Sequence, residues 1–491
     1  MSEHAAEPEE PGRRTAGEVE EVDVLVIGAG SGNTIPGPEL AEQRILVADD
    51  APWFGGTCLN VGCIPTKMFV HVGELRRHAL ESGRLGLEVP EARVHWQAVR
   101  DRVFGRIDGY SAGGEQYRRD GEPNVGLVRE TVRFAAGAGA VGDGRHLLET
   151  ESGRRILARF VVVAAGSRPQ ELPVLPWGPR VVSSNEIMRI DELPASLAVV
   201  GGGVVAAEFA ALFHALGVRV TQLVRSSVLR GQDEQIARAF AEQAAWDLRE
   251  GVAPVEALAD GEGVTMRLSD GAELRCELVL VAAGRVPNTD RLGTRQAGFD
   301  HHPDGRLVVD AAQRVLRGGA PVPGAFALGD VSSPHQLKHV ANHDARIVRE
   351  NLLRELRRRP GEAPEPVENT LGPVPAGVFS HPQIGSFGLT AAEAHEAGLE
   401  AVEAVQRYGD TAWGWALEDE HGFAKLVVER GSGRILGAHL IGPDAVVLMQ
   451  PLLQAASLGT PVQGLARGQY WPHPAASEIV ENLLLKAEEL L

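Results

Sequence analysis

Two of the three cysteines in this 491-residue sequence stand in one short segment, Gly55-Gly56-Thr57-Cys58-Leu59-Asn60-Val61-Gly62-Cys63-Ile64-Pro65-Thr66-Lys67. The third, Cys276, lies far away in an apolar, strand-like run. Two cysteines cannot supply the four ligands of a structural zinc site, and no Cys/His cluster lies nearby to complete one. The spacing suits a local disulfide at a helix start, where the helix terminus favours a thiolate. The alternative is two buried cysteines in a core helix.

The composition limits the class of protein. Hydrophobic residues make up 44% and charged residues 23%, as in an ordinary globular chain, and the length predicts roughly three domains. A formal net charge of −18 argues against nucleic acid or an anionic membrane as a general partner. No apolar run reaches the ~18 residues that span a bilayer. The acidic N-terminus has no apolar signal region, so a reactive cysteine pair in a cytoplasmic enzyme is expected.

A first dinucleotide-binding pattern opens the chain. An apolar strand at 22–27 leads into Gly28-Ala29-Gly30-Ser31-Gly32-Asn33, and a second strand at 44–48 ends in Asp49-Asp50. Glycines at such a turn admit a pyrophosphate, and an acid about twenty residues on binds a ribose hydroxyl. Asn33 stands at the third glycine position, and Pro36-Gly37-Pro38 follows. Because proline cannot continue a helix, the helix here is predicted to be broken, or to restart near Glu39.

A second pattern of the same kind is regular. A strand at 197–200 enters Gly201-Gly202-Gly203, and a helix runs on to Gly217. The next strand, at 218–224, ends in Arg225, with Arg230 five residues later, in place of the acid that a free ribose hydroxyl would need. Arginine suits a 2′-phosphate, which favours NADP over NAD. The alternative is that both arginines are merely solvated.

Three later features complete the pattern. Strands before Gly166 and Gly284 end in matching glycine turns that predict crossings between domains, and a further strand places Asp330 at a sheet edge where ligands bind. The last segment has strands and two unusually apolar helices, at 446–458 and 478–490, which suggest a subunit interface. Between these helices, prolines flank His473, and Glu478 opens the second one. His473 is either functional or an ordinary surface histidine.

Together, two glycine fingerprints, one Cys-x4-Cys and a late His-Pro…Glu resemble the flavin-dependent pyridine nucleotide–disulfide oxidoreductases, from about Val22 to the C-terminus. Within that family the resemblance is greatest to the mycothione reductases. It is carried by Gly55 to Val70, Phe104 to Asp108, Ser332 to His343 and Arg467 to Pro474. One departure is Val204, where the family usually has an aromatic lid over the nicotinamide site.

The resemblance implies roles for matching positions. Cys63 would be the flavin-side sulfur and Cys58 the interchange sulfur, with His473 and Glu478 of the partner subunit as the acid–base pair. Lys67 and Glu208 would form an ion pair near the flavin. FAD would be held by Gly28, Gly30, Asp50 and Asp330, and NADPH by Gly201, Gly203, Arg225 and Arg230. The wider set of cofactor-binding positions adds Ser31, Gly32, Gly56, Thr57, Lys67, Gly166, Glu208 and Gly284; no metal is implied.

The fold class implied is α/β, with two Rossmann-like dinucleotide-binding domains, for FAD and NADPH, and a C-terminal α+β dimerisation domain. The expected order is a disordered acidic tail (1–20), an FAD domain (21–168), an inserted NADPH domain (169–285), the rest of the FAD domain (286–359), a linker (360–372) and the dimerisation domain (373–491).

The expected function is that of an FAD-dependent enzyme that uses NADPH to reduce a small-molecule disulfide, mycothione, in a homodimer with shared active sites. A mercuric or thioredoxin reductase would need a second redox pair near its C-terminus, and residues 486–491 contain none. A dihydrolipoamide dehydrogenase would show an acid where Arg225 stands. A glutathione reductase would carry a substrate-binding arginine in the first helix, where this chain has Pro36-Gly37-Pro38. Two alternatives remain open. The substrate could be another low-molecular-weight disulfide, such as glutathione disulfide or a lipoamide, or the protein could be a flavin- and NADPH-binding redox sensor that turns over nothing.

Overall fold

A computed structural model describes residues 19–135, 144–359, 361, 364–370 and 372–491. The chain forms two compact units. The first contains Met1–Asn60, Tyr110–Arg168 and Val286–Asn369, and the second contains Val61–Gly109, Pro169–Arg285 and Thr370–Leu491. Both units are therefore discontinuous in sequence.

The first unit is built on an eight-stranded, mostly parallel sheet in the order β17-β18-β6-β1-β2-β3, extended beside β6 by β5 and β4. Val26 lies opposite both Val47 and Val162, so the carboxyl ends of β1, β2 and β6 meet at one edge of the sheet. The strands are β1 Val19–Ile27, β2 Ile45–Ala48, β3 Val125–Val128, β4 Val132–Phe134, β5 His146–Thr150, β6 Arg155–Val163, β17 Arg314–Arg317 and β18 Ala320–Ala327.

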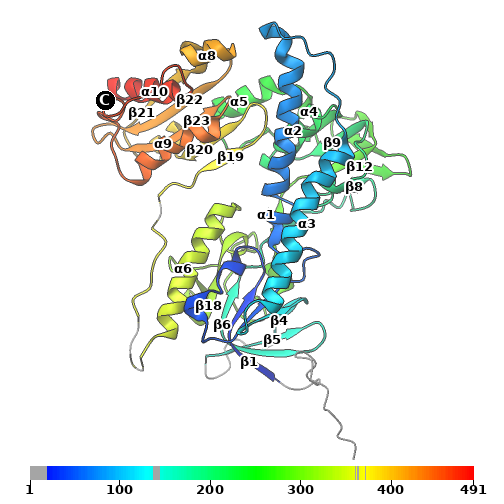
Figure 1. The fold of residues 1–491 in the computed structure, drawn as a ribbon, viewed down its shortest axis with the longest axis vertical. Helices are drawn as coiled ribbons and strands as arrows, with labels where there is room; N and C mark the ends of the chain where they lie inside the picture. The colour runs from blue at the N-terminus through cyan, green and yellow to red at the C-terminus, as the bar shows by residue number, and fades with distance from the viewer. Residues whose placement is uncertain (1–18, 136–143, 360, 362–363, 371) are drawn as a thin grey trace, which may run out of the picture. The chain divides into compact units, whose positions relative to one another are not determined.

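Both faces of this sheet are covered, which explains its nearly continuous apolar strands. Val24 and Val26 of β1 pack on one face with Val348 and Leu352 of helix α6 (Lys338–Leu356). Leu25 belongs to a second apolar cluster on the other face. Figure 1 shows α6 beside the strands β6 and β18.

The first glycine turn is not followed by an α-helix. Two 3₁₀ turns stand there instead, η1 (Ser31–Thr34) and η2 (Pro38–Leu40), which confirms the predicted interruption. Asn33, at the third glycine position, is held by the buried Arg118, whose Nε lies 2.9 Å from the Asn33 side-chain oxygen. Gly32 takes over the close packing, because a Cβ there would lie 2.9 Å from Val26 Cγ1.

The second unit contains a parallel sheet in the order β11-β10-β9-β15-β8 and a three-stranded antiparallel sheet, β12-β13-β14. Helix α4 follows β9 directly, as the second glycine fingerprint predicts. The elements are β8 Val181–Val182, β9 Ser196–Val200, α4 Val204–Ala215, β10 Arg219–Val224, α5 Glu234–Gln243, β11 Asp247–Glu250, β12 Pro254–Ala259, β13 Val264–Leu268, β14 Glu273–Cys276 and β15 Leu278–Val281. Short strands β7 (Ser167–Pro169) and β16 (Arg285–Pro287) stand where the chain crosses between units, and helices α1 (Gly56–Asn60), α2 (Cys63–Glu81) and α3 (Trp96–Asp120) precede them.

The C-terminal part of the second unit is an antiparallel sheet, β19-β20-β23-β22-β21, on which α9 and α10 pack (Figure 1). Strands β20 and β21 were not expected from the sequence. The elements are β19 Ala376–Val378, β20 Ile384–Gly388, α7 Ala391–Glu396, β21 Ala401–Arg407, α8 Ala412–Leu417, β22 Phe423–Glu429, β23 Ile435–Ile441, α9 Ala445–Ser457 and α10 Ser477–Glu489.

Two expectations need correction. The apolar side chains of α9 and α10 are mostly buried against their own sheet, so helix composition alone does not demand a partner subunit; Val447 and Leu458 remain exposed at 69% and 72%. Strand β1 begins at Val19, inside the predicted tail, while 1–18 and the linker positions 360, 362–363 and 371 lie outside the described residues. Within the described chain, no helix is both long and apolar enough to cross a membrane.

Candidate functional site

The first glycine turn has the geometry that a close-approaching ligand requires. Gly28 has φ +110°, and a Cβ there would lie 2.3 Å from the Ala164 carbonyl oxygen. Gly56, which opens the cysteine segment, packs directly on this turn: a Cβ on it would lie 2.5 Å from Gly30 Cα. Around a Cβ placed on Gly30, the nearest atom is Gly56 Cα at 3.8 Å, so the backbone is open there. This is the cradle a pyrophosphate needs.

Of the two acids after β2, the structure places Asp49 against the turn. Asp49 is 8% exposed, and its Oδ2 accepts the backbone N–H of Ala29 at 2.7 Å. Burial raises the pKa of the Asp49 carboxyl. The hydrogen bond from Ala29 and the positive charge of Arg129 partly offset that rise. Asp50, the acid expected to hold FAD, is exposed and accepts the Thr131 hydroxyl at 2.9 Å. The signal in the sequence was that Asp49 comes first after the apolar run.

Asp330 and Gly166 lie at the same end of the sheet. Ser167 Oγ donates to Asp330 Oδ2 at 2.6 Å, which ties the turn after β6 to the turn after β18. Gly166 has φ +66°, and no atom lies within 4 Å of a Cβ built on it. The carboxyl edge of the sheet therefore presents the Asp330 carboxylate and an open backbone position at Gly166.

The cysteine segment consists of two helix starts. Cys58 lies in the short helix α1 and is half-buried, while Cys63 is the first residue of α2 and is exposed. Asn60, 2% exposed, holds the turn by donating to the carbonyls of Phe54 and Gly56 at 2.9 and 3.0 Å. No pattern in the sequence indicated this role for Asn60. The exposure of Cys63 contradicts the alternative of two cysteines buried in a core helix.

Lys67, one turn along α2 from Cys63, forms an ion pair with Glu208 of α4, Nζ to Oε2 at 2.7 Å. Glu208 is 93% buried at its side chain, and its other oxygen accepts the Phe379 backbone N–H at 2.8 Å. The Lys67 ammonium also lies 4.7 Å from the centre of the Phe379 ring. Phe379 was not singled out from the sequence.

The second glycine turn is regular and open. Gly201 has φ +148° and a Cβ there would lie 2.2 Å from the Ala282 carbonyl oxygen, whereas nothing lies within 4 Å of a Cβ on Gly203, the N-cap of α4. Val204 is 37% exposed. At the same carboxyl edge of the sheet, after β15, a Cβ on Gly284 would lie 3.0 Å from the Gln170 side-chain oxygen.

Arg225 and Arg230 are both exposed, on a loop that follows β10. This loop is anchored over the glycine turn, because the Leu229 N–H donates to the Gly202 carbonyl at 2.7 Å. A second anchor is Glu250 at the end of β11, which accepts the Val228 N–H at 2.6 Å. The loop that carries both arginines is therefore held against the glycine turn, where a nucleotide ribose is expected.

His473 and Glu478 form a close pair. The His473 Nδ1 contacts Glu478 Oε1, and 68% of the His473 side chain is exposed against 10% of Glu478. Glu478 Oε2 also accepts the Trp413 backbone N–H at 3.2 Å. A buried, anchored carboxylate thus orients an exposed imidazole and leaves its Nε2 to exchange a proton.

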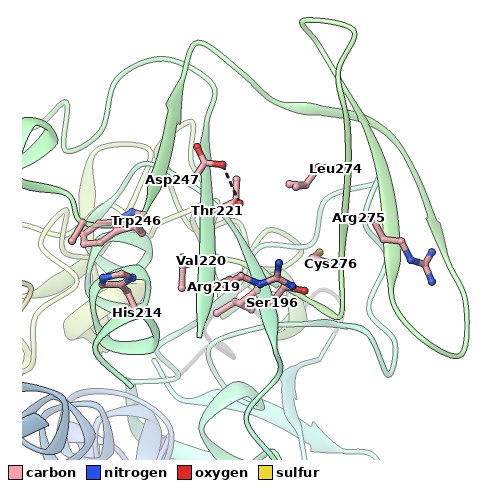
Figure 2. Close-up of a pocket in the computed structure, with 12 residues that line it drawn as sticks. Ser196, His214, Arg219, Val220, Thr221, Trp246, Asp247, Leu274, Arg275 and Cys276 are labelled. Carbon is pink, nitrogen blue, oxygen red and sulfur yellow. Dashed lines mark hydrogen bonds between the residues drawn. The ribbon is translucent and has the colours of Figure 1, made fainter. Parts of the chain in front are cut away.

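The third cysteine is separate from this chemistry. Cys276 ends β14 at a pocket of about 400 Å³ beside the starting residues of β9 and β10, Ser196 and Arg219, as Figure 2 shows. Burial raises the pKa of the Cys276 thiol to about 11, so it stays protonated and unreactive near neutral pH.

The fold and the candidate site together indicate the class of protein. The sequence matches the family described as pyridine nucleotide-disulphide oxidoreductase over residues 22–345, and that family's dimerisation domain over 374–484. The chain belongs to this family of flavoprotein oxidoreductases, whose cofactors are FAD and a pyridine nucleotide.

Among curated relatives, the chain is 46% identical over 471 residues to a protein named mycothione reductase from Mycobacterium tuberculosis, covering 95% of this chain and 99% of the relative. It is 33% identical over 490 residues to dihydrolipoyl dehydrogenase of Haloferax volcanii, covering 95% and 97%. The crystal structure of LpdA from Mycobacterium tuberculosis has a TM-score of 0.79 at 25% identity, covering 96% of this chain and 100% of that one. The flavoprotein disulfide reductase RclA from Escherichia coli, at 24% identity and TM-score 0.78, supports the fold alone.

Proposed function

We propose that this protein reduces mycothione with NADPH, through a redox-active pair formed by Cys58 and Cys63. The observation that supports the substrate best is the 46% identity to a mycothione reductase over nearly the whole of both chains. The observation that supports catalysis best is the paired His473 and Glu478, because a disulfide-exchange reaction needs a proton donor and acceptor.

The overall reaction is NADPH + H⁺ + RSSR → NADP⁺ + 2 RSH. FAD, when bound, would supply the two-electron chemistry that links NADPH to the Cys58–Cys63 disulfide. Reduction of that disulfide leaves a thiolate on Cys63 and a thiol on Cys58, which becomes the attacking thiolate when His473 takes its proton. The Cys58 thiolate then attacks one sulfur of the substrate, forming a mixed disulfide and releasing one thiol. The Cys63 thiolate attacks Cys58, which releases the second thiol and closes the Cys58–Cys63 bond.

The surroundings of the cysteines suit these steps. Cys63 stands at the first position of a 19-residue helix, whose partial positive charge stabilises a thiolate. His473 would take the proton from Cys58 and give it to the first departing thiolate, and would then pass a proton taken up from water to the second, while Glu478 holds the imidazole in the required tautomer. The Lys67–Glu208 pair would place a fixed ammonium near the flavin.

The coenzyme proposed is NADPH rather than NADH. The loop that carries Arg225 and Arg230 is hydrogen-bonded to the glycine turn where we expect the nucleotide, and no acid ends β10 to bind a free ribose hydroxyl. We also infer a homodimer with active sites shared between subunits, on the basis of the dimerisation domain at 374–484, and a cytoplasmic setting, which suits a reactive thiol pair.

The test is NADPH oxidation at 340 nm, with mycothione, glutathione disulfide and lipoamide supplied separately. Turnover of mycothione at least tenfold more efficient than of the other two is expected, and Cys58→Ser should abolish it. Comparable turnover of glutathione disulfide would contradict the proposal that mycothione is the substrate. A folded, flavin-loaded protein that oxidises NADPH with none of the three would favour the redox sensor, which needs the cysteines but not His473.

A further inference from the structure

The first glycine turn offers a phosphate a weaker helix terminus than the second one does. In the second fingerprint, Gly203 caps a 12-residue α-helix, α4, whose aligned peptides favour a phosphate at its start. In the first, only the four-residue 3₁₀ turn η1 follows, and Pro36-Gly37-Pro38 ends it. A four-residue turn has almost no macrodipole. The two phosphates of FAD would therefore gain less from a helix terminus here, and the Arg118 guanidinium beside the turn is already paired with Glu122.

Lys338, the first residue of α6, lies at this turn. Its Nζ donates to Ser31 Oγ at 2.9 Å, and Ser31 Oγ donates to Asn342 Oδ1 at 3.0 Å, one turn further along α6. Ser31 directly follows Gly30 and is 7% exposed. Helix α6 thus holds the residue whose backbone would face the pyrophosphate.

Two of the four lysines, Lys67 and Lys425, are paired with carboxylates. The other two have neutral partners: the exposed Lys486 donates to the Val405 carbonyl at 3.2 Å, whereas the half-buried Lys338 donates to the Ser31 hydroxyl at the glycine turn. Lys338 also stands at a helix N-terminus with no acid in its first turn and no side-chain cap. A cation at the positive end of a helix is unfavourable unless an anion lies beside it.

We propose that Lys338 binds the pyrophosphate of FAD and replaces, from α6, the charge that the interrupted helix after the first glycine turn does not supply. An ammonium has three N–H donors. Ser31 uses one, and two are left for phosphate oxygens. When FAD is bound, Lys338 thereby links the 286–369 segment of the first unit to the glycine turn in its first segment.

The test measures FAD affinity, not turnover. Holoenzyme is diluted in series until FAD leaves, and the rise in flavin fluorescence gives Kd at several NaCl concentrations. Lys338→Gln can still donate to the Ser31 hydroxyl but carries no charge. Loss of one charge-assisted contact should weaken FAD binding about ten- to a hundredfold and flatten its salt dependence. Lys338→Arg should stay within a few-fold of wild type.

Asn342→Leu is the matched control, because it removes the other α6 contact to the same Ser31 hydroxyl without changing charge. It should leave both Kd and salt dependence close to wild type. Far-UV circular dichroism checks folding, and Lys338→Met serves if Lys338→Gln does not fold. A wild-type Kd in Lys338→Gln would overturn the proposal. Equal weakening by Asn342→Leu would also overturn it, because Lys338 would then only support the turn. Since disulfide turnover plays no part, failure here leaves the proposed reaction untouched.

Discussion

Lys425, on β22, carries a buried positive charge, and replacing it by Met should leave two carboxylates without their cation. Its Nζ lies 2.7 Å from Asp233 Oδ2 and 3.0 Å from Glu403 Oε2. The exposed side-chain fractions are 4% for Lys425, 8% for Asp233 and 23% for Glu403. Asp233 is also the N-cap of α5, so the cluster ties the nucleotide-binding sheet region to the C-terminal sheet.

The magnitude follows from what stays buried. Removing one partner of a buried ion pair costs about 3–5 kcal/mol, because the remaining charge loses its compensation. Glu403 can turn partly toward water, and Asp233 keeps the backbone N–H groups of Gln235 and Ile236 at 3.0 and 3.3 Å. Both features place the expected loss near the lower end, about 3 kcal/mol, or roughly a hundredfold in the unfolding equilibrium.

The assay is urea unfolding followed by circular dichroism, comparing transition midpoints. Arg238→Met is the matched control, because Arg238 pairs on the same α5 with Glu234 at exposed fractions of 63% and 85%. Such a surface pair is worth about 0.3–0.5 kcal/mol. Adding Asp233→Asn and Glu403→Gln to Lys425→Met should recover part of the loss. A Lys425→Met midpoint no lower than that of Arg238→Met would refute the reasoning.

Three further results are expected. Replacing Arg225 and Arg230 together by Gln should raise the KM for NADPH at least tenfold and leave the KM for NADH nearly unchanged. The reason is that each charge-assisted hydrogen bond to a phosphate is worth about 1.5–3 kcal/mol. Equal use of both coenzymes by the wild-type protein would contradict this prediction. Mixing inactive Cys58→Ser with inactive His473→Ala should restore activity after subunit exchange, since a mixed dimer with shared sites has one site free of both lesions; no recovery at any ratio would place each site within one chain. Burial lowers the pKa of His381 from 6.5 to about 3. As the pH falls, the unfolded chain therefore binds a proton at His381 before the folded chain does, and stability is lost between about pH 7 and pH 3. His381→Asn should flatten that part of the curve of urea midpoint against pH; an unchanged slope would argue against a half-buried, neutral imidazole.

Local patterns in the sequence were sufficient for much of the architecture. Both glycine turns follow their predicted strands, and Pro36 and Pro38 interrupt the first helix as expected, because proline's missing N–H acts locally. The Lys67–Glu208 pair joins residues 141 positions apart, and only the family resemblance indicated it. The missed strands β20 and β21 carry Gly, Ser, Glu and Gln among their apolar residues, so their alternation is weak.

What the sequence determined by itself is therefore the set of reactive groups: two cysteines at a helix start, a proline-flanked histidine, and two nucleotide turns, all defined by neighbours within a few residues. Which groups meet was decided by the tertiary structure. Asp49 rather than Asp50 faces the glycine turn because the strand pleat sends successive side chains to opposite faces. Lys338 meets Ser31 across 307 positions because parallel strands bring distant turns to one edge of a sheet. Such contacts depend on strand order, which no local pattern encodes.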